Sequence, residues 1–246
     1  MTYLRSWPNG ASAAVPVLLC LPQAGASALQ FRDWQVRLGS SAAVYAVQLP
    51  GREDRWDEPA PSSIAEVVGA VVAELADAGL LDRPLVVFGD SFGGLIAYEL
   101  ARAVGPSALV VCVSRAPAHW ARQGGLHDND VERLASASVE GSTLPSALVA
   151  ELRDIAAEVL RRDAELSKTF RDAPGTEPLR CPVYAWGAVD DETVTPAQLD
   201  DWREVTTGPL HRHDFVGGHR ISRDDPVTVL GRLSHVLAGI AEEEPS

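Results

Sequence analysis

Short apolar runs that alternate with helical segments constrain the fold of this chain more than any other feature. Five runs are almost continuously apolar, which is typical of buried strands, and 210–216 is a sixth candidate; the five are residues 15–20, 43–48, 85–88, 108–113 and 183–186. Residues 63–78 carry apolar positions three or four apart, and further helices are expected at 95–104 and about 226–241. This alternation predicts an α/β fold with a mostly parallel central sheet and helices on both faces.

Length and composition are those of one globular domain. The chain has 246 residues, 46% hydrophobic and 22% charged, so we expect a single domain over 1–246. No apolar run approaches about 18 residues, and the opening MTYLRSWPNG has no apolar signal core. We therefore expect a cytoplasmic protein. Its cysteines, Cys20, Cys112 and Cys181, are expected to be small core residues in a reducing compartment.

The segment from about residue 119 to 178 breaks the alternation of strands and helices. It contains no convincing strand, and the apolar spacing along 144–170 is helical. A long helical insertion between two strands of a sheet usually covers a site, so we expect a lid subdomain here. The alternative is an ordinary pair of crossover helices.

The junction after the third apolar run carries the strongest signal for chemistry. Its sequence is GDSFGG, in which Ser91 stands between Gly89 and Gly93 in the G-x-S-x-G pattern of a nucleophile elbow. The chain must reverse sharply there, and glycine leaves room where a side chain would clash. The following helix directs its free N–H groups toward the serine, so that the N–H of Phe92 would stabilise an oxyanion. A phosphate-binding loop is not indicated, because GxxxxGK[ST] is missing from the sequence.

A serine nucleophile needs a base and an orienting acid, which in this type of fold follow in the order Ser, Asp, His. Asp190 and Asp191 come after the fifth apolar run, and His219 follows the last candidate strand. All of them lie at the carboxyl ends of strands, the edge where open α/β sheets bind ligands. We therefore predict a catalytic triad of Ser91, Asp191 and His219.

Other acidic and basic side chains compete for the two supporting roles. Asp191 is preferred over Asp190 because it stands three residues before Val194, the usual spacing in hydrolase acid loops. The alternative for Asp190 is a turn-forming or capping residue. Four further histidines are expected to make surface or local hydrogen bonds rather than to act as the base: His119, His127, His211 and His213.

The motifs together resemble type II thioesterases, the external editing enzymes of polyketide and non-ribosomal peptide synthesis. The turn LPQAGA (21–26) is similar to the family's early PxAGG turn, and QLPGREDR (48–55) matches its QLPGRExR signature. SRAP (114–117) is similar to the segment that opens the family's lid, and TPAQL (195–199) and the GGH ending also fit. The resemblance covers nearly the whole chain, and QLPGRE together with GGH is specific.

This resemblance implies an α/β-hydrolase fold with a helical lid. It implies a serine thioesterase that clears stalled or aberrant acyl groups from the phosphopantetheine arm of acyl or peptidyl carrier proteins, as in antibiotic biosynthesis. Ser91 would be the nucleophile, His219 the general base and Asp191 its orienting acid. The backbone N–H groups of Ala24 and Phe92 would form the oxyanion hole. No metal or diffusible cofactor is implied.

The expected partner is acidic, and so is this chain. Its net charge of −13 argues against nucleic acid and anionic membranes as partners. Docking of an acidic carrier therefore needs a local basic patch, for which Arg161, Arg162, Lys168 and Arg171 on the insertion are candidates. The alternative is a solvated helix face with carboxylates nearby. We expect the protein to be a monomer.

The site departs from the family pattern at its elbow and at Gln23. The family usually has GHSMGA, where this chain has Asp90, Phe92 and Gly94. We expect Asp90 to belong to the substrate site, bonded to the backbone of the turn or paired with an arginine such as Arg115. A negative charge near a forming oxyanion slows attack, which predicts that Asp90→His retains or raises hydrolysis. Gln23 is expected to shape the pocket, or to be only a turn residue.

Three other functions are compatible with the same motifs. A hydroxyl or amine could capture the acyl group in place of water, which would make the protein a product-releasing cyclase or an acyltransferase. A small-molecule carboxylesterase would use the same triad, although QLPGRE speaks against it. A carrier-binding module with a silenced site is the third, and the intact triad speaks against that.

Overall fold

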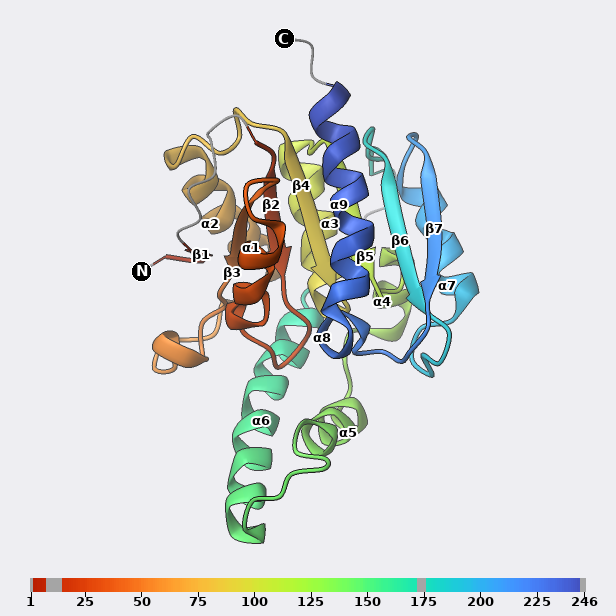
Figure 1. Ribbon diagram of the computed structural model, residues 1–246. Coiled ribbons are helices and arrows are strands. Elements are labelled where there is room, and N and C mark those ends of the chain that lie inside the picture. Colours follow the sequence, from red (N-terminus) through yellow and green to blue (C-terminus); the bar gives the residue numbers. More distant parts are fainter. Residues whose placement is uncertain (1, 8–14, 172–175, 244–246) are drawn as a thin grey trace.

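A seven-stranded sheet forms the centre of the computed structural model, which describes residues 2–7, 15–171 and 176–243 (Figure 1). The strands are β1 (Leu4–Ser6), β2 (Val17–Leu21), β3 (Ala43–Val47), β4 (Leu85–Asp90), β5 (Ala108–Cys112), β6 (Val183–Ala188) and β7 (Leu210–Phe215). Their order is β1-β3-β2-β4-β5-β6-β7, with β1 antiparallel to β3 and every other neighbouring pair parallel. The mostly parallel sheet predicted from the apolar runs is therefore confirmed.

Helices lie on both faces of this sheet. The longer ones are α1 (Arg32–Leu38), α2 (Ile64–Asp77), α3 (Phe92–Val104), α4 (Pro117–Gln123), α5 (Asp128–Ser138), α6 (Ser146–Ser167) and α9 (Pro226–Glu243). Shorter segments are η1 (Ala28–Phe31), η2 (Glu53–Arg55), α7 (Pro196–Asp200), η3 (Asp201–Val205) and α8 (Ile221–Asp224). Helices α1 and α9 cover one face, while α2 and α3 cover the other (Figure 1).

The central strand β2 shows why its sequence is apolar without interruption. Val17, Leu19 and Leu21 pack in the core on the α2 and α3 side. Leu18 and Cys20, which alternate with them, pack in the core on the α1 and α9 side. Successive side chains of a strand point to opposite faces, so a strand covered on both faces must be apolar at every position.

Aromatic rings fill the core on the α1 and α9 side. Trp34 of α1 packs edge-on against Phe31, at 4.9 Å between ring centroids, and against Phe88 of β4, at 5.0 Å. Trp186 of β6 packs edge-on against Phe215 of β7 at 5.6 Å. Edge-to-face aromatic contacts of this kind add to the stabilisation from buried area. They hold together the strands that carry the site at their carboxyl ends.

Helices α4, α5 and α6 occupy the segment between β5 and β6, and α5 and α6 project together from one end of the sheet (Figure 1). The described part of the predicted range 119–178 contains no strand, and residues 172–175 lie outside the described residues. One face of the second half of α6 is buried, for example at Leu160, whereas Leu148 and Leu152 in its first half are 40% and 38% exposed. The base of this helix is thus packed against the core, and its far end is open to solvent.

Two elements and the state of the cysteines complete the comparison with the sequence. Strand β1 and helix α1 were not predicted from the apolar pattern. Cys20 and Cys112 are buried core residues as predicted, Cys181 is partly buried, and all three are free thiols. In the described part of the chain, no helix is both long enough and apolar enough to span a membrane.

Candidate functional site

Ser91 lies in the sharp turn between β4 and α3. Its backbone has φ 51° and ψ −113°, a conformation that residues other than glycine rarely adopt. The neighbouring glycines make this turn possible. A Cβ on Gly89 would come within 2.5 Å of the Cα of Gly94, and one on Gly93 within 2.3 Å of the carbonyl oxygen of Leu21. The G-x-S-x-G pattern therefore has a steric cause in this fold.

The structure brings the three predicted triad residues together. Nε2 of His219, in the loop after β7, lies 2.9 Å from Oγ of Ser91. Nδ1 of the same ring lies 2.8 Å from Oδ2 of Asp191, which follows β6. The imidazole side chain is 16% exposed and the carboxylate is fully buried. This arrangement has the geometry that a serine nucleophile, a base and an orienting acid require.

Hydrogen bonds to the carboxylate of Asp191 favour its ionised form. Its Oδ1 accepts hydrogen bonds from the backbone N–H groups of Thr193, at 2.7 Å, and Val194, at 3.2 Å. Burial by itself raises the pKa of Asp191, but the hydrogen bond from His219 and these backbone N–H groups outweigh burial and hold the pKa below its ordinary value. An ionised carboxylate at Nδ1 stabilises the imidazolium that forms when the ring accepts a proton.

The alternative acid has a different place. The side chain of Asp190 is exposed, and its backbone N–H donates to the carbonyl oxygen of Gly217 at 2.9 Å. That bond ties the acid loop to the loop of His219, but it puts no carboxylate against the ring. Between the two neighbouring aspartates, the geometry favours Asp191.

The turn after β2 approaches the elbow closely, since Gly93 lies against the carbonyl oxygens of Leu21 and Pro22. Phe92 is the first residue of α3, where backbone N–H groups have no acceptor within the helix. The N–H of Gly25 donates to Oδ2 of Asp163 at 2.7 Å and is not available to a ligand. The N–H groups of Ala24 and Phe92 remain our candidates for the oxyanion hole.

The structure corrects the expectations for Asp90. Its side chain is completely buried and lines none of the cavities near the elbow. It accepts hydrogen bonds from Gln30 and Ser222, rather than from the turn backbone or from Arg115. The guanidinium of Arg115 instead lies 4.7 Å from the ring centroid of Trp120. As the last residue of β4, Asp90 lies behind Gln30 and Ser222, which line the groove in its place, so its substrate-binding role stays a prediction that no direct contact with a cavity supports.

The other histidines have local partners. Nε2 of His119 lies 2.6 Å from Oδ2 of Asp201, and His211 stacks on Tyr184 at 4.6 Å between ring centroids. His213 packs edge-on against Phe215 of the same strand, and His127 precedes α5 as its N-cap. None of these contacts includes the nucleophile.

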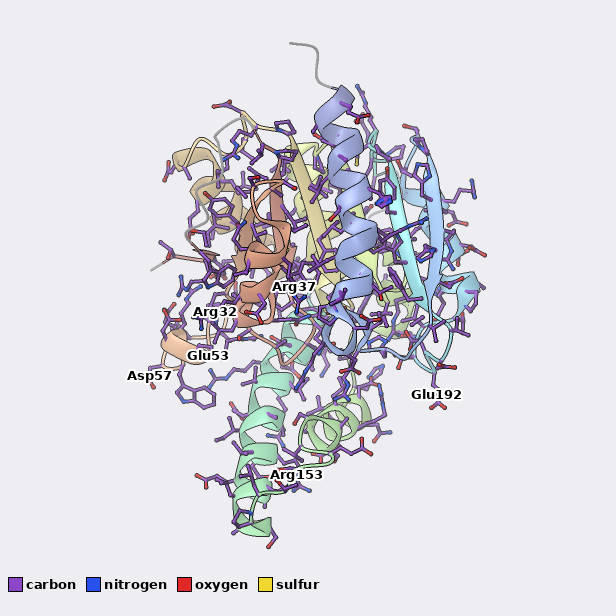
Figure 2. All side chains as sticks on the ribbon, viewed as in Figure 1. Arg32, Arg37, Glu53, Asp57, Arg153 and Glu192 are labelled. Carbon is purple, nitrogen blue, oxygen red and sulfur yellow. The ribbon has the colours of Figure 1, made fainter. Side chains whose placement is uncertain are left out.

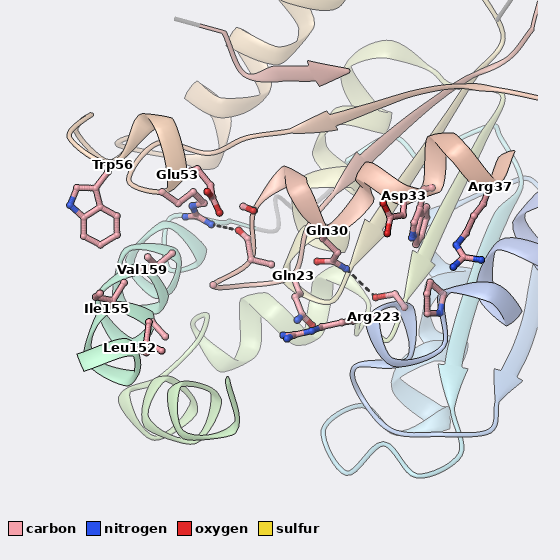
Figure 3. A pocket seen from close by; sticks show the side chains of 18 residues that line it. Gln23, Gln30, Asp33, Arg37, Glu53, Trp56, Leu152, Ile155, Val159 and Arg223 are labelled. Atoms are coloured by element: carbon pink, nitrogen blue, oxygen red, sulfur yellow. Dashed lines mark hydrogen bonds between the residues drawn. The ribbon is translucent and has the colours of Figure 1, made fainter. Parts of the chain in front are cut away.

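Two cavities lie beside the turn that follows β2 and share several lining residues. A groove of about 700 Å³ opens to solvent between α1, the η2 turn, α6 and the α8–α9 junction, with Trp56 and Ile155 on one wall (Figure 3). A smaller cavity of about 100 Å³ is lined by Ala24 and by Arg220, the residue that follows His219. The smaller cavity has the candidate oxyanion donor Ala24 in its wall, although the triad side chains line neither cavity. Gln23 lines both, which agrees with a place at the pocket and not in a remote turn.

Three of the four basic residues proposed on the insertion, Arg161, Arg162 and Lys168, have carboxylate partners nearby. Arg161 lies within 4 Å of carboxylate oxygens of Glu132 and Glu158, and Lys168 lies 2.7 Å from Glu165. Arg162 also pairs with Glu158, and Arg171 donates to backbone carbonyl oxygens of its own turn. This is the solvated, charge-compensated face that was the alternative to a docking patch.

Three polar residues near the site were not singled out from the sequence. Gln30 and Ser222 donate hydrogen bonds to Asp90, and Asp163 accepts one from the backbone of the turn after β2. A signal existed only for Asp163, which is a charged residue at the helical spacing of the buried positions Leu160 and Ser167. A carboxylate on the buried face of a helix is expected to have a partner.

Comparison with known proteins agrees with this fold. The family model described as "Thioesterase domain" matches residues 16–237. The chain is 32% identical to the thioesterase PikA5 of Streptomyces venezuelae over 96% of its length and 85% of that protein. The structure of the type II thioesterase BorB from the borrelidin biosynthetic cluster superposes with a TM-score of 0.80, at 30% identity, covering 96% of this chain and 97% of that one.

Some relatives are longer. The chain is 34% identical to the AMB antimetabolite synthetase AmbE of Pseudomonas aeruginosa over 87% of its own length, but it spans only 10% of that protein. It spans 61% of the probable cadicidin biosynthesis thioesterase of Streptomyces griseus. The match nevertheless includes most of this chain in each case. The chain belongs to the thioesterase family, with the α/β-hydrolase fold, and its structural neighbours include type II thioesterases.

Proposed function

We propose that this protein hydrolyses acyl thioesters carried on the phosphopantetheine arm of acyl or peptidyl carrier proteins, and so removes stalled or aberrant acyl groups from a polyketide or non-ribosomal peptide synthase. The observation that carries the proposal is the hydrogen-bonded series of Ser91, His219 and Asp191, with separations of 2.9 and 2.8 Å. We place the protein in the cytoplasm with the synthase. Type II thioesterases need no cofactor for this reaction.

In the first half-reaction, Nε2 of His219 accepts the proton of Ser91 as Oγ attacks the thioester carbonyl carbon. Negative charge moves onto the carbonyl oxygen, which the N–H groups of Ala24 and Phe92 would stabilise. Loss of one such positioned donor typically costs about 3 kcal/mol of transition-state stabilisation. The C–S bond then breaks, His219 returns the proton to the departing sulfur, and the acyl group remains esterified to Ser91.

In the second half-reaction, water replaces the carrier thiol. His219 accepts a proton from water as its oxygen attacks the acyl-enzyme carbonyl carbon, and the same N–H groups stabilise the second oxyanion. The bond to Oγ breaks, the proton returns to Ser91, and the free acid leaves. Asp191 stays ionised throughout and stabilises the imidazolium in both halves.

The dimensions of the inner cavity favour hydrolysis of short acyl groups. Its volume is about 100 Å³, and its walls include the apolar side chains of Leu134, Ala137 and Leu160. A short acyl group fits a cavity of this size.

The open groove offers a path for the arm of the carrier. Arg37 and Arg223 line it and have no ion-pair partner among the described residues, and the carboxylates of Asp33 and Glu53 line it as well (Figure 3). The side chains of Arg32 and Arg37 lie on helix α1 beside the sheet, whereas Arg153 lies toward the projecting end of α6 (Figure 2). We infer that the phosphate of the arm, or acidic side chains of the carrier, contact Arg37 and Arg223.

The test compares, for each of three acyl groups, a carrier-bound thioester with an oxygen ester of the same acid. Carrier-bound acetyl, hexanoyl and dodecanoyl thioesters are assayed against p-nitrophenyl esters of the same acids, with products identified by mass spectrometry. We expect kcat/KM to be highest for the short carrier thioester, with free acid as product. A higher kcat/KM for the oxygen esters would identify a carboxylesterase, and a cyclised or transferred product would identify the other acyl-enzyme reaction.

A further inference from the structure

Asp90 directly precedes the nucleophile, yet it belongs to a separate buried cluster behind the elbow. Its Oδ2 accepts a hydrogen bond from Oγ of Ser222 at 2.5 Å and one from Nε2 of Gln30 at 2.8 Å. Nε2 of Gln30 also lies 3.2 Å from Oγ of Ser222, so the three side chains form a closed set. The mechanism above uses none of them.

This cluster joins the elbow to the segment that carries the base. Ser222 is 1% exposed and stands in α8 (Ile221–Asp224), which begins two residues after His219. The bond from Ser222 to Asp90 spans 132 positions of sequence. It therefore connects the residue before Ser91 to the short helix immediately after His219.

The loop that carries His219 needs such an anchor. Gly217 has φ +131°, which only glycine adopts readily, and Gly218 follows it. On the side that precedes His219, the backbone is held by the bond from the N–H of Asp190 to the carbonyl oxygen of Gly217. On the side that follows it, Ser222 provides a side-chain bond to the elbow itself.

Stability alone does not account for a carboxylate at this position. Burial raises the pKa of Asp90 above its ordinary value, although the hydrogen bonds from Ser222 and Gln30 oppose the rise. Oδ1 of Asp90 and Oε1 of Gln30 are buried without a hydrogen-bond partner among the described residues. A buried polar cluster that is only partly satisfied usually destabilises a fold relative to apolar packing. Groups of this kind are typical of functional sites.

We propose that Asp90 is a positioning residue, which through its hydrogen bond to Ser222 fixes α8 and the preceding loop so that Nε2 of His219 stays within hydrogen-bonding distance of Ser91. This inference rests on the proposed function, because it assigns His219 the role of base. The role of Asp90 is indirect, because its side chain contacts neither the substrate nor the reacting atoms. Gln30, on the wall of the groove, holds the carboxylate from the other side (Figure 3).

Single variants break the bond from either end. Ser222→Ala removes the donor and Asp90→Ala removes the acceptor, and each is expected to lower kcat for an acyl carrier about tenfold while KM changes less than twofold. The double variant is expected to be no slower than either single variant, because both remove the same bond. Asp90→Asn keeps an accepting oxygen and is expected to retain kcat within about threefold.

A measurement on the free protein separates positioning from general damage. The proton on Nδ1 of His219, bonded to Asp191, is expected to give a downfield proton NMR signal that broadens or disappears in Ser222→Ala and persists in Asp90→Asn. Ser234→Ala is the matched control, since this half-buried serine hydroxyl in α9 bonds only the carbonyl oxygen of Leu230. The control is expected to keep both the signal and kcat, and thermal unfolding checks that each variant is folded.

The outcomes distinguish this inference from the proposed function. Wild-type kcat and an unchanged signal in Ser222→Ala would overturn the inference, as would additive losses in the double variant or an effect on KM alone. If the wild-type protein fails to hydrolyse carrier thioesters, the proposed function fails. In that case the NMR signal and the rate at which a fluorophosphonate labels Ser91 still test whether Asp90 positions His219.

Discussion

Oδ2 of Asp163, on helix α6, accepts a hydrogen bond from the backbone N–H of Gly25 in the turn after β2, at 2.7 Å. The same carboxylate accepts hydrogen bonds from both terminal guanidinium nitrogens of Arg52, at 3.0 and 2.5 Å. Both side chains of this ion pair are almost completely buried. One carboxylate therefore joins helix α6, the QLPGRE segment and the turn that holds the candidate oxyanion donor Ala24.

Loss of this carboxylate is expected to destabilise the fold strongly. Asp163→Ala leaves the charge of Arg52 buried without a partner, which typically lowers the free energy of unfolding by about 3–5 kcal/mol. Urea unfolding measures the change. Glu158→Ala, which removes an exposed partner of Arg162, is the control and is expected to cost less than about 1 kcal/mol. An Asp163→Ala loss as small as the control's would show that the pair does not hold the lid to the core.

The two neighbouring aspartates after β6 provide a matched pair for the acid. Asp191→Asn removes the carboxylate that receives Nδ1 of His219, and the imidazole then loses its correct tautomer and the charge that stabilises its protonated form. We expect kcat to fall by about 10⁴-fold, as in other triads. Asp190→Asn changes an exposed side chain and is expected to keep kcat within about twofold. Steady-state kinetics of the two variants decide, and the reverse order would reassign the acid.

The buried carboxyl of Asp90 predicts a pH dependence of stability. Its pKa is raised in the folded protein, so the folded state binds this proton more tightly than the unfolded chain does. The contribution of Asp90 to stability should therefore fall as pH rises above the ordinary carboxyl range near 4. Asp90→Asn lacks this titration, so the melting temperature of the variant minus that of the wild type should increase between about pH 4 and pH 7. A difference that is constant, or larger at low pH, would contradict the raised pKa.

The groove predicts which arginines contact the carrier. Arg37→Ala together with Arg223→Ala should raise KM for a carrier-bound acyl group several-fold, because both side chains lack ion-pair partners in the described structure. The same variant should keep kcat/KM for a small acyl-pantetheine thioester within about twofold. Arg161→Ala together with Lys168→Ala, whose charges are already paired, should change neither constant. Weaker carrier turnover in that control alone would move the docking surface to the lid.

Much of the fold was predictable because its physical causes are local. Continuous apolar runs such as Val17–Leu21 mark strands buried on both faces, and the elbow glycines mark a turn without room for side chains. Strand β1 has three residues and one partner strand, and α1 is only seven residues long. Elements this short depend on tertiary packing rather than on their own periodicity, so the pattern did not indicate them.

The site was predictable only in part for a related reason. The meeting of Ser91, Asp191 and His219 follows from the topology, because all three come after parallel strands and the carboxyl ends of these strands lie at one edge of the sheet. The direction of a single side chain does not. Asp90 was expected to line the substrate site, but its buried carboxyl group bonds Ser222, which is distant in sequence. Pairings of this kind depend on the finished fold.

The most direct test of the account follows the acyl group itself. An acyl carrier is mixed with the enzyme, the reaction is quenched within one turnover, and both proteins are measured by intact mass and by peptide mass spectrometry. We predict a transient acyl adduct on the peptide that contains Ser91, followed by free acid and unloaded carrier, and no adduct or unloading with Ser91→Ala. Unloading of the carrier at the wild-type rate by Ser91→Ala would contradict the account.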